Sequence, residues 1–432
     1  MKKIIAMLLA LVMVLGLAAC GASEPAPTEA PKTDATTPAA TPTEAAGPEE
    51  ITLKVWAPQE DWGDDAKWLN IMLKKFEEAH PEYAITWDLG VCGEGDAKSL
   101  VGTDPTAAGD VFMFASDQIG ALIQAGALAK LGGSYLEQVQ NGYTDFFKNT
   151  VTYEGDIYGF PMTINTWFMY YNKSLVSDED AKSLEKLLEK GTVAFPMTTA
   201  WYNGAFFLAN GGTIFGEAGN DEAAGIQFGG EAGYAAAAKM VELMANPNFI
   251  NDADGKGNSG LKDGSVVAYF NGSWEYTNAE GTGVYDVLGE NLGCAQLPTV
   301  NIDGKDVPMK SLAGTKCVGV NPNAKNQKAA MQLAAFLASE EGQQLRFELR
   351  NITPALASLA ETDAVKASAC AQAEIAVANN TSAIQSGLPA MDTAFWGPMG
   401  TFGANVDNGT VTADNVQEQV DALVEAMNGG GL

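Results

Sequence analysis

The stretch DVFMFASDQIGALIQAGALAKL, Asp110–Leu131, decides the fold. Its first part, Asp110–Phe114, is a largely apolar run, typical of a buried parallel strand. Upstream, residues 51–56 alternate between apolar and polar side chains as a strand does, and residues 66–79 place apolar side chains on one face of a helix. Tyr83–Leu89 alternates again as a second strand. Strands and helices that alternate in this way predict an α/β fold.

Later segments carry helical periodicity too. We expect a helix at Asn326–Leu337 and another near the end of the chain, where Gly429 ends it. The apolar stripe of that last helix consists of Val416, Val420, Leu423, Val424 and Met427. Residues 51–432 are too many for one ordinary core, so the length predicts two domains or one large bilobed unit.

The first twenty residues have the pattern of an export signal. Two lysines precede a short apolar run, Ile4–Leu17, and small residues follow. This run is too short for a membrane-spanning helix. The last four of the first twenty residues, Leu17–Cys20, resemble a bacterial lipobox, in which the cysteine is acylated and becomes the first residue of the mature protein. We therefore expect residues 1–20 to be a lipoprotein signal peptide and Cys20 to anchor the exported chain to the outer face of the cell membrane.

Residues 21–50 are built almost entirely from Ala, Pro, Thr and Glu. They include no aromatic and no long aliphatic residue, so they cannot bury enough apolar surface to fold. We expect a disordered spacer that holds the folded body away from the bilayer.

The composition excludes some partners. A formal net charge of −29 makes the chain a poor candidate for binding nucleic acid or anionic lipid surfaces. Four cysteines besides Cys20 could form disulfides in an exported protein or stay as buried thiols: Cys92, Cys294, Cys317 and Cys370. Both alternatives remain open from the sequence.

No metal or cofactor site is expected. The one histidine, His80, precedes Pro81 at the end of the first helix, where a surface loop is the natural interpretation. Residues 252–263 faintly resemble a calcium loop, but Lys256 occupies a ligand position and Asp263 replaces the usual glutamate. We expect a solvated turn there.

Tryptophans are the side chains that point to a ligand. A pyranose ring has an apolar face and a rim of hydroxyls, so its site needs flat aromatic platforms with planar hydrogen-bonding groups at the edge. The chain has eight tryptophans, of which Trp56, Trp68 and Trp87 fall on predicted strand or helix faces and are expected in the core. Trp201 beside Tyr202 is expected in a loop, and Trp274 and Trp396 also follow turn-rich segments.

Six segments, in order, resemble those of the extracellular solute-binding proteins of ABC importers, of the maltose and maltodextrin type (family 1). They are Asp110–Leu131, Tyr153–Pro161 leading into Tyr170–Lys173, Ala209–Gly212, Gly264–Trp274, Ala335–Gln344 and Pro389–Trp396. The resemblance implies a type II periplasmic-binding-protein-like fold, in which two α/β lobes joined by a hinge enclose a ligand cleft. It places residues 51–163 and 315–355 in the first lobe, and residues 164–314 and 356–432 in the second.

The resemblance also implies the ligand-binding residues. Trp201, Tyr202, Trp274 and Trp396 match its stacking aromatics, and Asp117 matches an aspartate that accepts hydrogen bonds from sugar hydroxyls, although a helix N-cap role is also open for it. Several positions depart from the best-known members: Phe114 replaces a tryptophan, Gln118 an arginine, Asn165 and Thr199 glutamates, and Gly400 an arginine. The loop after the first strand offers Glu60, Asp61 and Trp62 as ligand contacts, or else a turn with helix capping.

The function implied by the resemblance is a non-catalytic binding lipoprotein. It would capture malto-oligosaccharides by lobe closure, without a cofactor, and deliver them to permease subunits that work with a cytoplasmic ATPase. It would act as a monomer. The departures leave the exact sugar open, so the same importer class with another oligosaccharide or small solute is the alternative. A surface glycosidase with paired carboxylates and a structural adhesin are the other classes that we consider.

Overall fold

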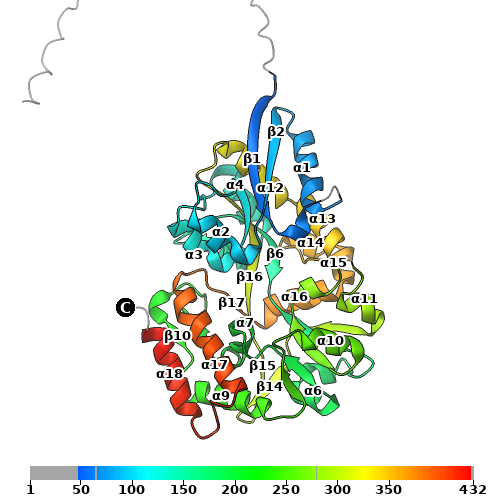
Figure 1. Ribbon diagram of the computed structural model, residues 1–432, viewed down its shortest axis with the longest axis vertical. Helices are drawn as coiled ribbons and strands as arrows, with labels where there is room; N and C mark the ends of the chain where they lie inside the picture. Colours follow the sequence, from blue (N-terminus) through cyan, green and yellow to red (C-terminus); the bar gives the residue numbers. More distant parts are fainter. Residues whose placement is uncertain (1–46, 64–65, 279, 430–432) are drawn as a thin grey trace, which may run out of the picture. The chain divides into compact units, whose positions relative to one another are not determined.

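The computed structural model describes residues 47–63, 66–278 and 280–429 (Figure 1). The predicted signal peptide, Cys20 and most of the predicted spacer lie outside the described residues. No helix within the described part of the chain is long and apolar enough to cross a membrane. The compact unit Gly47–Leu432 contains all the elements discussed below.

The first lobe is built on a six-stranded sheet. Its strands lie in the order β17 (Ser382–Ile384), β16 (Ser311–Val320), β3 (Val111–Ala115), β1 (Glu49–Ala57) and β2 (Tyr83–Val91), and β6 (Phe160–Asn165) also pairs with β16. β1 pairs in parallel with β2 and β3, whereas β16 is antiparallel to β3 and β6. The helices of this part are α1 (Trp68–Ala79), α2 (Ala97–Thr103), α3 (Ile119–Gln124), α4 (Gly133–Gly142), α5 (Asp145–Thr150), α12 (Gln327–Leu337) and α13 (Glu340–Arg350).

The second lobe is built on a five-stranded sheet. Its strands lie in the order β11 (Phe249–Asn251), β8 (Val193–Phe195), β12 (Ala268–Asn271), β7 (Phe168–Asn172) and β13 (Leu292–Ala295). Its helices are α6 (Leu184–Lys190), α7 (Ala200–Asn203), α8 (Ala205–Ala209), α9 (Gly230–Met244), α10 (Lys256–Asp263), α11 (Val284–Leu288), α16 (Ala369–Asn380), α17 (Gly397–Asp407) and α18 (Val416–Gly429).

Smaller elements complete the structure. Three two-stranded pairs are β4 (Thr152–Tyr153) with β5 (Asp156–Ile157), β9 (Thr213–Ile214) with β10 (Ile226–Gln227), and β14 (Thr299–Ile302) with β15 (Lys305–Pro308). The short helices α14 (Ala357–Ala360) and α15 (Asp363–Ala367) follow α13 along the chain.

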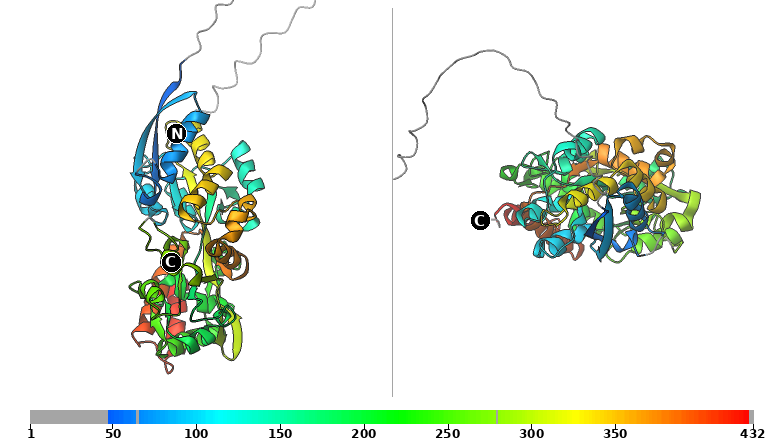
Figure 2. Two further views of the ribbon diagram at one scale, coloured as in Figure 1. Left: turned by 90° about the vertical axis from the view of Figure 1, so that its right-hand side faces the viewer. Right: turned by 90° about the horizontal axis from the view of Figure 1, so that it is seen from above.

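Two hydrophobic cores correspond to the two lobes. One core takes its buried residues from 51–164, 317–338 and 355–359, and the other takes them from 167–312 and 370–427. β16 belongs to both, because its Leu312 lies in the second core while its Cys317 and Val318 lie in the first. The ribbon views show β16 running between the lobes (Figures 1 and 2). The predicted two-lobed α/β fold is confirmed.

Most predicted elements appear within a few residues of their expected bounds. The alternating pattern at 51–56 lies in β1, the apolar run at 110–114 in β3, and the helical pattern at 66–79 in α1. Trp68 is buried as expected, and Trp56 and Trp87 pack against the same core while half-buried.

Three local predictions have clear outcomes. The expectation of a loop at Trp201 is wrong, because this residue lies in α7. The four described cysteines are free thiols, so the open question of disulfides resolves to none among them. The solvated turn expected at residues 252–263 is wrong for most of the segment, because Lys256–Asp263 forms α10 with Leu261 buried. Asp252, just before this helix, accepts the backbone N–H of Gly257 at 2.9 Å. Among the described residues, no group of His, Cys, Asp or Glu side chains is arranged to hold a metal ion.

Candidate ligand-binding site

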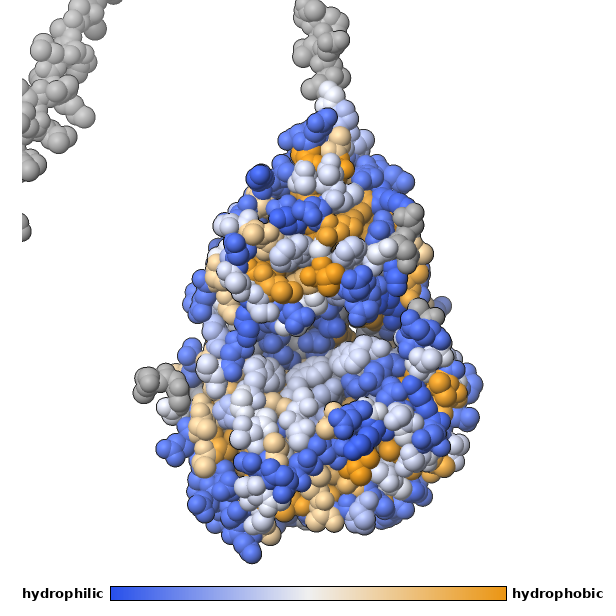
Figure 3. Space-filling view, in the orientation of Figure 1, coloured by the Kyte–Doolittle hydropathy of each residue, from blue (hydrophilic) through white to orange (hydrophobic). Residues whose placement is uncertain are grey.

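A cavity of about 370 Å³ lies where the two lobes face each other. Figure 3 shows the hollow between them, bordered mainly by hydrophilic residues. The residues that line the cavity are Glu94, Gly95, Ala115, Asp117, Gln118, Asn165, Trp201, Trp274, Lys316, Gln385 and Trp396. Neighbouring hollows of about 230 and 480 Å³ share Trp274 with it and include Glu60.

Second-lobe aromatic residues form one wall of the cavity. The rings of Trp201 and Trp274 stack with their centroids 5.9 Å apart and their planes 21° from parallel. Trp201 is fixed further by its indole N–H, which donates to Oε1 of Gln385 at 2.9 Å. Trp274 follows β12 and is 42% exposed, while Trp396 packs edge-on against the buried Phe395. Three tryptophans thus border the cavity, and Trp274 is the most exposed of them.

The first lobe contributes hydrogen-bonding groups. Asp117 and Gln118 lie in a 3-10 turn that directly follows β3, so the buried strand presents both side chains at its carboxyl end. Burial raises the pKa of Asp117 to about 6, despite a hydrogen bond from Gln385 that lowers it. Gln118 is tied into the protein, because its Oε1 accepts the backbone N–H of Lys98 at 2.7 Å and its amide donates to the Gly95 carbonyl. Of the two, Asp117 is therefore better placed to accept a hydrogen bond from a ligand.

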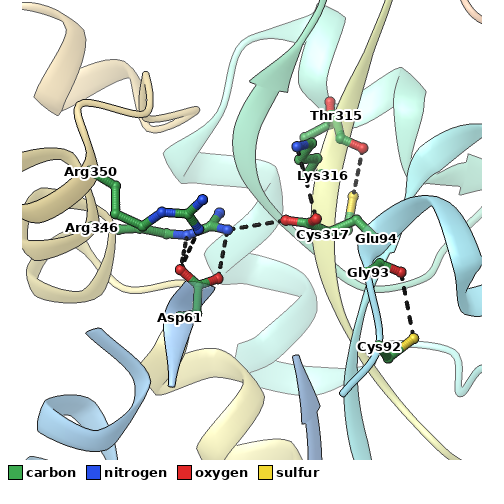
Figure 4. Close-up of polar contacts among 9 residues, drawn as sticks. All are labelled: Asp61, Cys92, Gly93, Glu94, Thr315, Lys316, Cys317, Arg346 and Arg350. Atoms are coloured by element: carbon green, nitrogen blue, oxygen red, sulfur yellow. Dashed lines mark hydrogen bonds and ion pairs between the residues drawn. The ribbon is translucent and has the colours of Figure 1, made fainter. Parts of the chain in front are cut away.

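Charged side chains form a network on the first-lobe side, and two of its members, Glu94 and Lys316, also line the cavity (Figure 4). Arg346 is buried on α13 and donates to Asp61 at 2.8 Å and to Glu94 at 3.0 Å, and Arg350 donates to the same Asp61 at 2.6 Å. Lys316 approaches the other carboxylate oxygen of Glu94 at 3.8 Å. Burial by itself would raise the pKa of Glu94, but Lys316 and Arg346 outweigh it and lower the pKa to about 2. Glu94 is therefore ionised at any physiological pH.

The structure brings six of the predicted contacts to the cavity: Asp117, Gln118, Asn165, Trp201, Trp274 and Trp396. Glu60 borders the neighbouring hollows. Cys20 lies outside the described residues.

Four predicted contacts do not line the cavity. Asp61 is fully buried in its ion pairs, and Phe114 is fully buried in the first core, so ligand contact does not fit the position of either. Tyr202 is buried beneath Trp201, where its hydroxyl donates to Asn271 at 3.0 Å. Trp62 is half-buried, packs against the first core and donates to the Ala57 carbonyl at 3.3 Å.

Some lining residues were not among the predictions. Glu94, Lys316 and Gln385 come from three distant parts of the chain, and the fold alone brings them together. One signal was available for Lys316, which interrupts the otherwise apolar or small residues of Ser311–Val320.

A two-lobed α/β fold with an aromatic and polar cavity between its lobes defines a binding protein of the periplasmic type. The chain belongs to the family of bacterial extracellular solute-binding proteins, whose profile matches residues 72–373. The family resemblance seen in the sequence is confirmed.

Known proteins of this kind are similar over most of the chain. A solved structure with acarbose shares 43% identity and a TM-score of 0.82, and the match covers 88% of this chain and 99% of that one. The maltodextrin-binding protein MalE1 from L. casei BL23 shares 26% identity and a TM-score of 0.79 over 88% and 99% of the two chains.

Curated relatives match over shorter regions. The galactooligosaccharide-binding protein of Bacillus subtilis (strain 168) is 29% identical over 63% of this chain and 65% of its own length. The maltooligosaccharide ABC transporter solute-binding lipoprotein of Streptococcus pneumoniae (strain ATCC BAA-255 / R6) is 29% identical over 57% and 59%. The matched regions thus span less than two thirds of these two relatives.

Proposed function

We propose that this protein captures malto-oligosaccharides outside the cell and hands them to the permease of an ABC importer. The observation that carries the proposal is the meeting of Trp201, Trp274 and Trp396 with Asp117 and Asn165 in one cavity between the lobes. Flat apolar rings opposite hydrogen-bonding side chains match the two surfaces of a pyranose ring. The maltodextrin-binding proteins among the similar structures support the same ligand class.

The energetics agree with a reversible binding protein. Stacking of sugar rings on these tryptophans buries on the order of a few hundred Å² of apolar surface, which contributes several kcal/mol before ordering costs, at about 25 cal/mol per Å². Asp117 and Asn165 add directional hydrogen bonds at the edge. Micromolar affinity is the expected range, low enough for release to a permease.

Lobe closure is the proposed mechanism of capture and delivery. We assign residues 51–163 with 315–355 to the first lobe and residues 164–314 with 356–432 to the second. The two cores divide the chain at nearly the same places, although Ile164, Leu356 and Leu359 belong to the first core. A ligand that contacts both lobes favours the closed form by the difference in its contacts, so the permease can distinguish loaded from empty protein. The hinge lies where β16 and β6 pass between the lobes.

We propose that the protein is not an enzyme. Glycoside hydrolysis needs a carboxylic acid and a second, separate carboxylate flanking the bond. Among the described residues that line the cavity, the carboxylates are Glu94 and Asp117. The ion pairs of Glu94 with Arg346 and Lys316 hold it ionised and engaged, which disfavours a role in proton transfer.

Location and partners complete the proposal. The signal pattern and the lipobox-like Leu17–Cys20 support export and lipid anchoring through Cys20 on the outer face of the cell membrane. The proposed macromolecular partners are the permease subunits and their cytoplasmic ATPase, and the protein acts as a monomer.

One relative favours a second ligand candidate, because it is a galactooligosaccharide-binding protein. Calorimetric titration of the full-length protein with maltotriose, β-1,4-galactotriose and cellotriose separates the candidates. Saturable binding of maltotriose alone supports the proposal, binding of galactotriose alone replaces the ligand, and binding of none contradicts both. Chromatography of the bound sugar after incubation tests catalysis, since a binding protein returns the oligosaccharide unchanged.

A further inference from the structure

Lys316 has an unusual position in the sheet. Every other residue of the ten-residue strand β16 is buried, and Lys316 alone is only partly buried, with 23% of its side chain exposed. The pairing of β16 with β6 shifts register between Lys316 and Cys317, which is the mark of a β-bulge or similar irregularity. Bulges redirect side chains and are frequent beside functional sites. Here the irregularity lies at the side chain that emerges from the strand into the cavity.

The surroundings of Lys316 come from both lobes. Its ammonium lies 3.8 Å from Glu94 on the first-lobe side and 5.6 Å from the centroid of the Trp274 ring on the second-lobe side. An ammonium over an indole face is attracted by the quadrupole of the ring. Among the described residues that line the cavity, Lys316 is the only cation. It therefore connects the charged network with the aromatic wall.

Trp274 has fewer other contacts that fix its ring than Trp201 has. Trp201 is held by the hydrogen bond of its indole N–H to Gln385, at 2.9 Å, and is only half-exposed. Trp274 lies in a single 3-10 turn, Ser273–Glu275, and its side chain is 42% exposed. Its ring stacks loosely with Trp201, with centroids 5.9 Å apart, and the ammonium of Lys316 lies 5.6 Å from its centroid, so these two side chains limit how the ring can turn.

We propose that Lys316 is a positioning residue for sugar binding, which holds the Trp274 ring in its binding orientation through a cation–π contact while Glu94 fixes the ammonium. This inference rests on the proposed function for its ligand. It differs from a direct ligand contact, since Lys316 acts on affinity through Trp274. Without the charge of Lys316, the exposed Trp274 ring takes other rotamers. The ligand must then order the ring when it binds, and this entropic cost weakens binding.

A double-mutant cycle tests this coupling by calorimetric titration of the full-length protein with maltotriose. Lys316→Met keeps the length and apolar stem of the side chain and removes the charge, and Lys316→Arg keeps the charge. We expect Lys316→Met to weaken binding three- to tenfold and Lys316→Arg to stay within twofold. In a Trp274→Ala background, Lys316→Met is expected to change affinity by less than twofold. An equal loss in that background, or no loss in the wild type, overturns the proposal.

A ligand-free measurement separates this inference from the proposed function. The charge beside the indole alters its emission, so the tryptophan fluorescence spectrum of the empty protein should differ between wild type and Lys316→Met. That difference should vanish when Trp274→Ala is present in both proteins. If no sugar binds the wild type, the proposed function fails, yet the spectral cycle still reports whether Lys316 orders the ring. A spectral difference that persists without Trp274 contradicts the contact, and thermal melts identify any variant that fails to fold.

Discussion

The two walls of the cavity are held in different ways. The first-lobe wall rests on buried charges, in which Arg346 joins Asp61 and Glu94 and is itself only 1% exposed. The second-lobe wall consists of stacked rings, with Trp274 partly open to solvent. Buried ion pairs fix a geometry but tolerate no loss of a partner, whereas stacked rings accept a ligand face without a fixed hydrogen-bond pattern. One wall therefore sets the shape of the site and the other supplies adaptable contact area.

Two buried glutamates show how much the nearby cations of the charged wall matter. Glu94 has its pKa lowered to about 2, because Lys316 and Arg346 outweigh burial. Glu374, on α16, has its pKa raised to about 7 by burial, which its neighbours Thr353, Ser273 and Lys316 only partly offset. The pKa values differ because Glu94 has two cations nearby, Lys316 and Arg346, whereas Glu374 is influenced by Lys316 alone among cations. The charged network thus keeps Glu94 ionised, whereas at Glu374 on α16 the effect of Lys316 is too weak to outweigh burial.

The largest expected effect is on the charged wall. Arg346→Met leaves the fully buried Asp61 with Arg350 alone and weakens the pairing of Glu94, so we expect a loss of about 3–5 kcal/mol in the free energy of unfolding. Denaturant unfolding measures it. The double variant Asp61→Asn with Arg346→Met is the control, and it should lose less than the sum of the single changes. A loss below about 1 kcal/mol for Arg346→Met would show that this network does not hold the wall.

The next effect concerns Glu374. The pKa of Glu374 is higher in the folded state, about 7, than in the unfolded state, near 4.5. Protonated Glu374 therefore contributes its full stabilisation below pH 4.5, and this contribution is lost as the pH rises through about 7. Glu374→Gln removes this titration. Relative to wild type, the variant should therefore gain up to about 3 kcal/mol between pH 4.5 and pH 8, with little gain at pH 4. Charged and titratable groups facing Glu374 are Lys316, Tyr170, Cys294 and Cys370.

Unfolding free energies of both proteins across this pH range give a difference curve, which cancels contributions from Asp117 and other groups. A flat difference curve would mean that Glu374 is paired as well as Glu94 is, and the contrast between the two glutamates would fail. Glu361→Gln is a matched surface control, because this exposed side chain pairs with Lys366 at 2.8 Å.

A smaller effect is expected on the aromatic wall. Trp274→Ala should weaken sugar binding tenfold or more, at least about 1.4 kcal/mol, because it removes a stacking platform. The thermal midpoint of the empty protein should stay nearly unchanged, since the ring is largely outside the core. Trp68→Ala is the control: this ring is buried and its indole N–H donates to the Gly342 carbonyl at 2.7 Å, so stability should fall by about 3–5 kcal/mol. Equal destabilisation by both changes would place Trp274 in the core.

The family resemblance predicted the aromatic wall but not the charged wall. Trp201, Trp274 and Trp396 match the stacking aromatics of the family, and all three line the cavity. Local pattern alone was less reliable, because the loop expected at Trp201 is a helix. The partners of Asp61 lie 285 and 289 residues away along the chain, and no periodicity connects them. Asp61 therefore looked like a free acceptor in a loop. Phe114 differs from Asp61, because the apolar run Asp110–Phe114 already predicted a buried strand and only the family resemblance indicated ligand contact there.

The fold was easier to predict from the sequence than the site, because helices and strands are indicated by patterns among neighbouring residues. The alternation at 51–56 and the stripe on α18 each depend on residues within one element, and both are confirmed. The site depends on which strand ends meet. Lys316 and Gln385 enter the cavity from β16 and from the segment after β17, which lie side by side only in the folded sheet.

The smallest effect tests whether surface charge also joins the walls. Lys98 on α2 pairs with Asp392 of the second lobe at 2.6 Å, and both side chains are more than one third exposed. Such a pair contributes about 0–1 kcal/mol and weakens with salt. Lys98→Met should therefore change sugar affinity less than threefold at low salt and have no effect at 0.5 M salt, measured by titration. A larger, salt-independent loss would mean that the walls are joined by ion pairs outside the buried network. In that case the division between a rigid charged wall and an adaptable aromatic wall would no longer describe how the lobes meet.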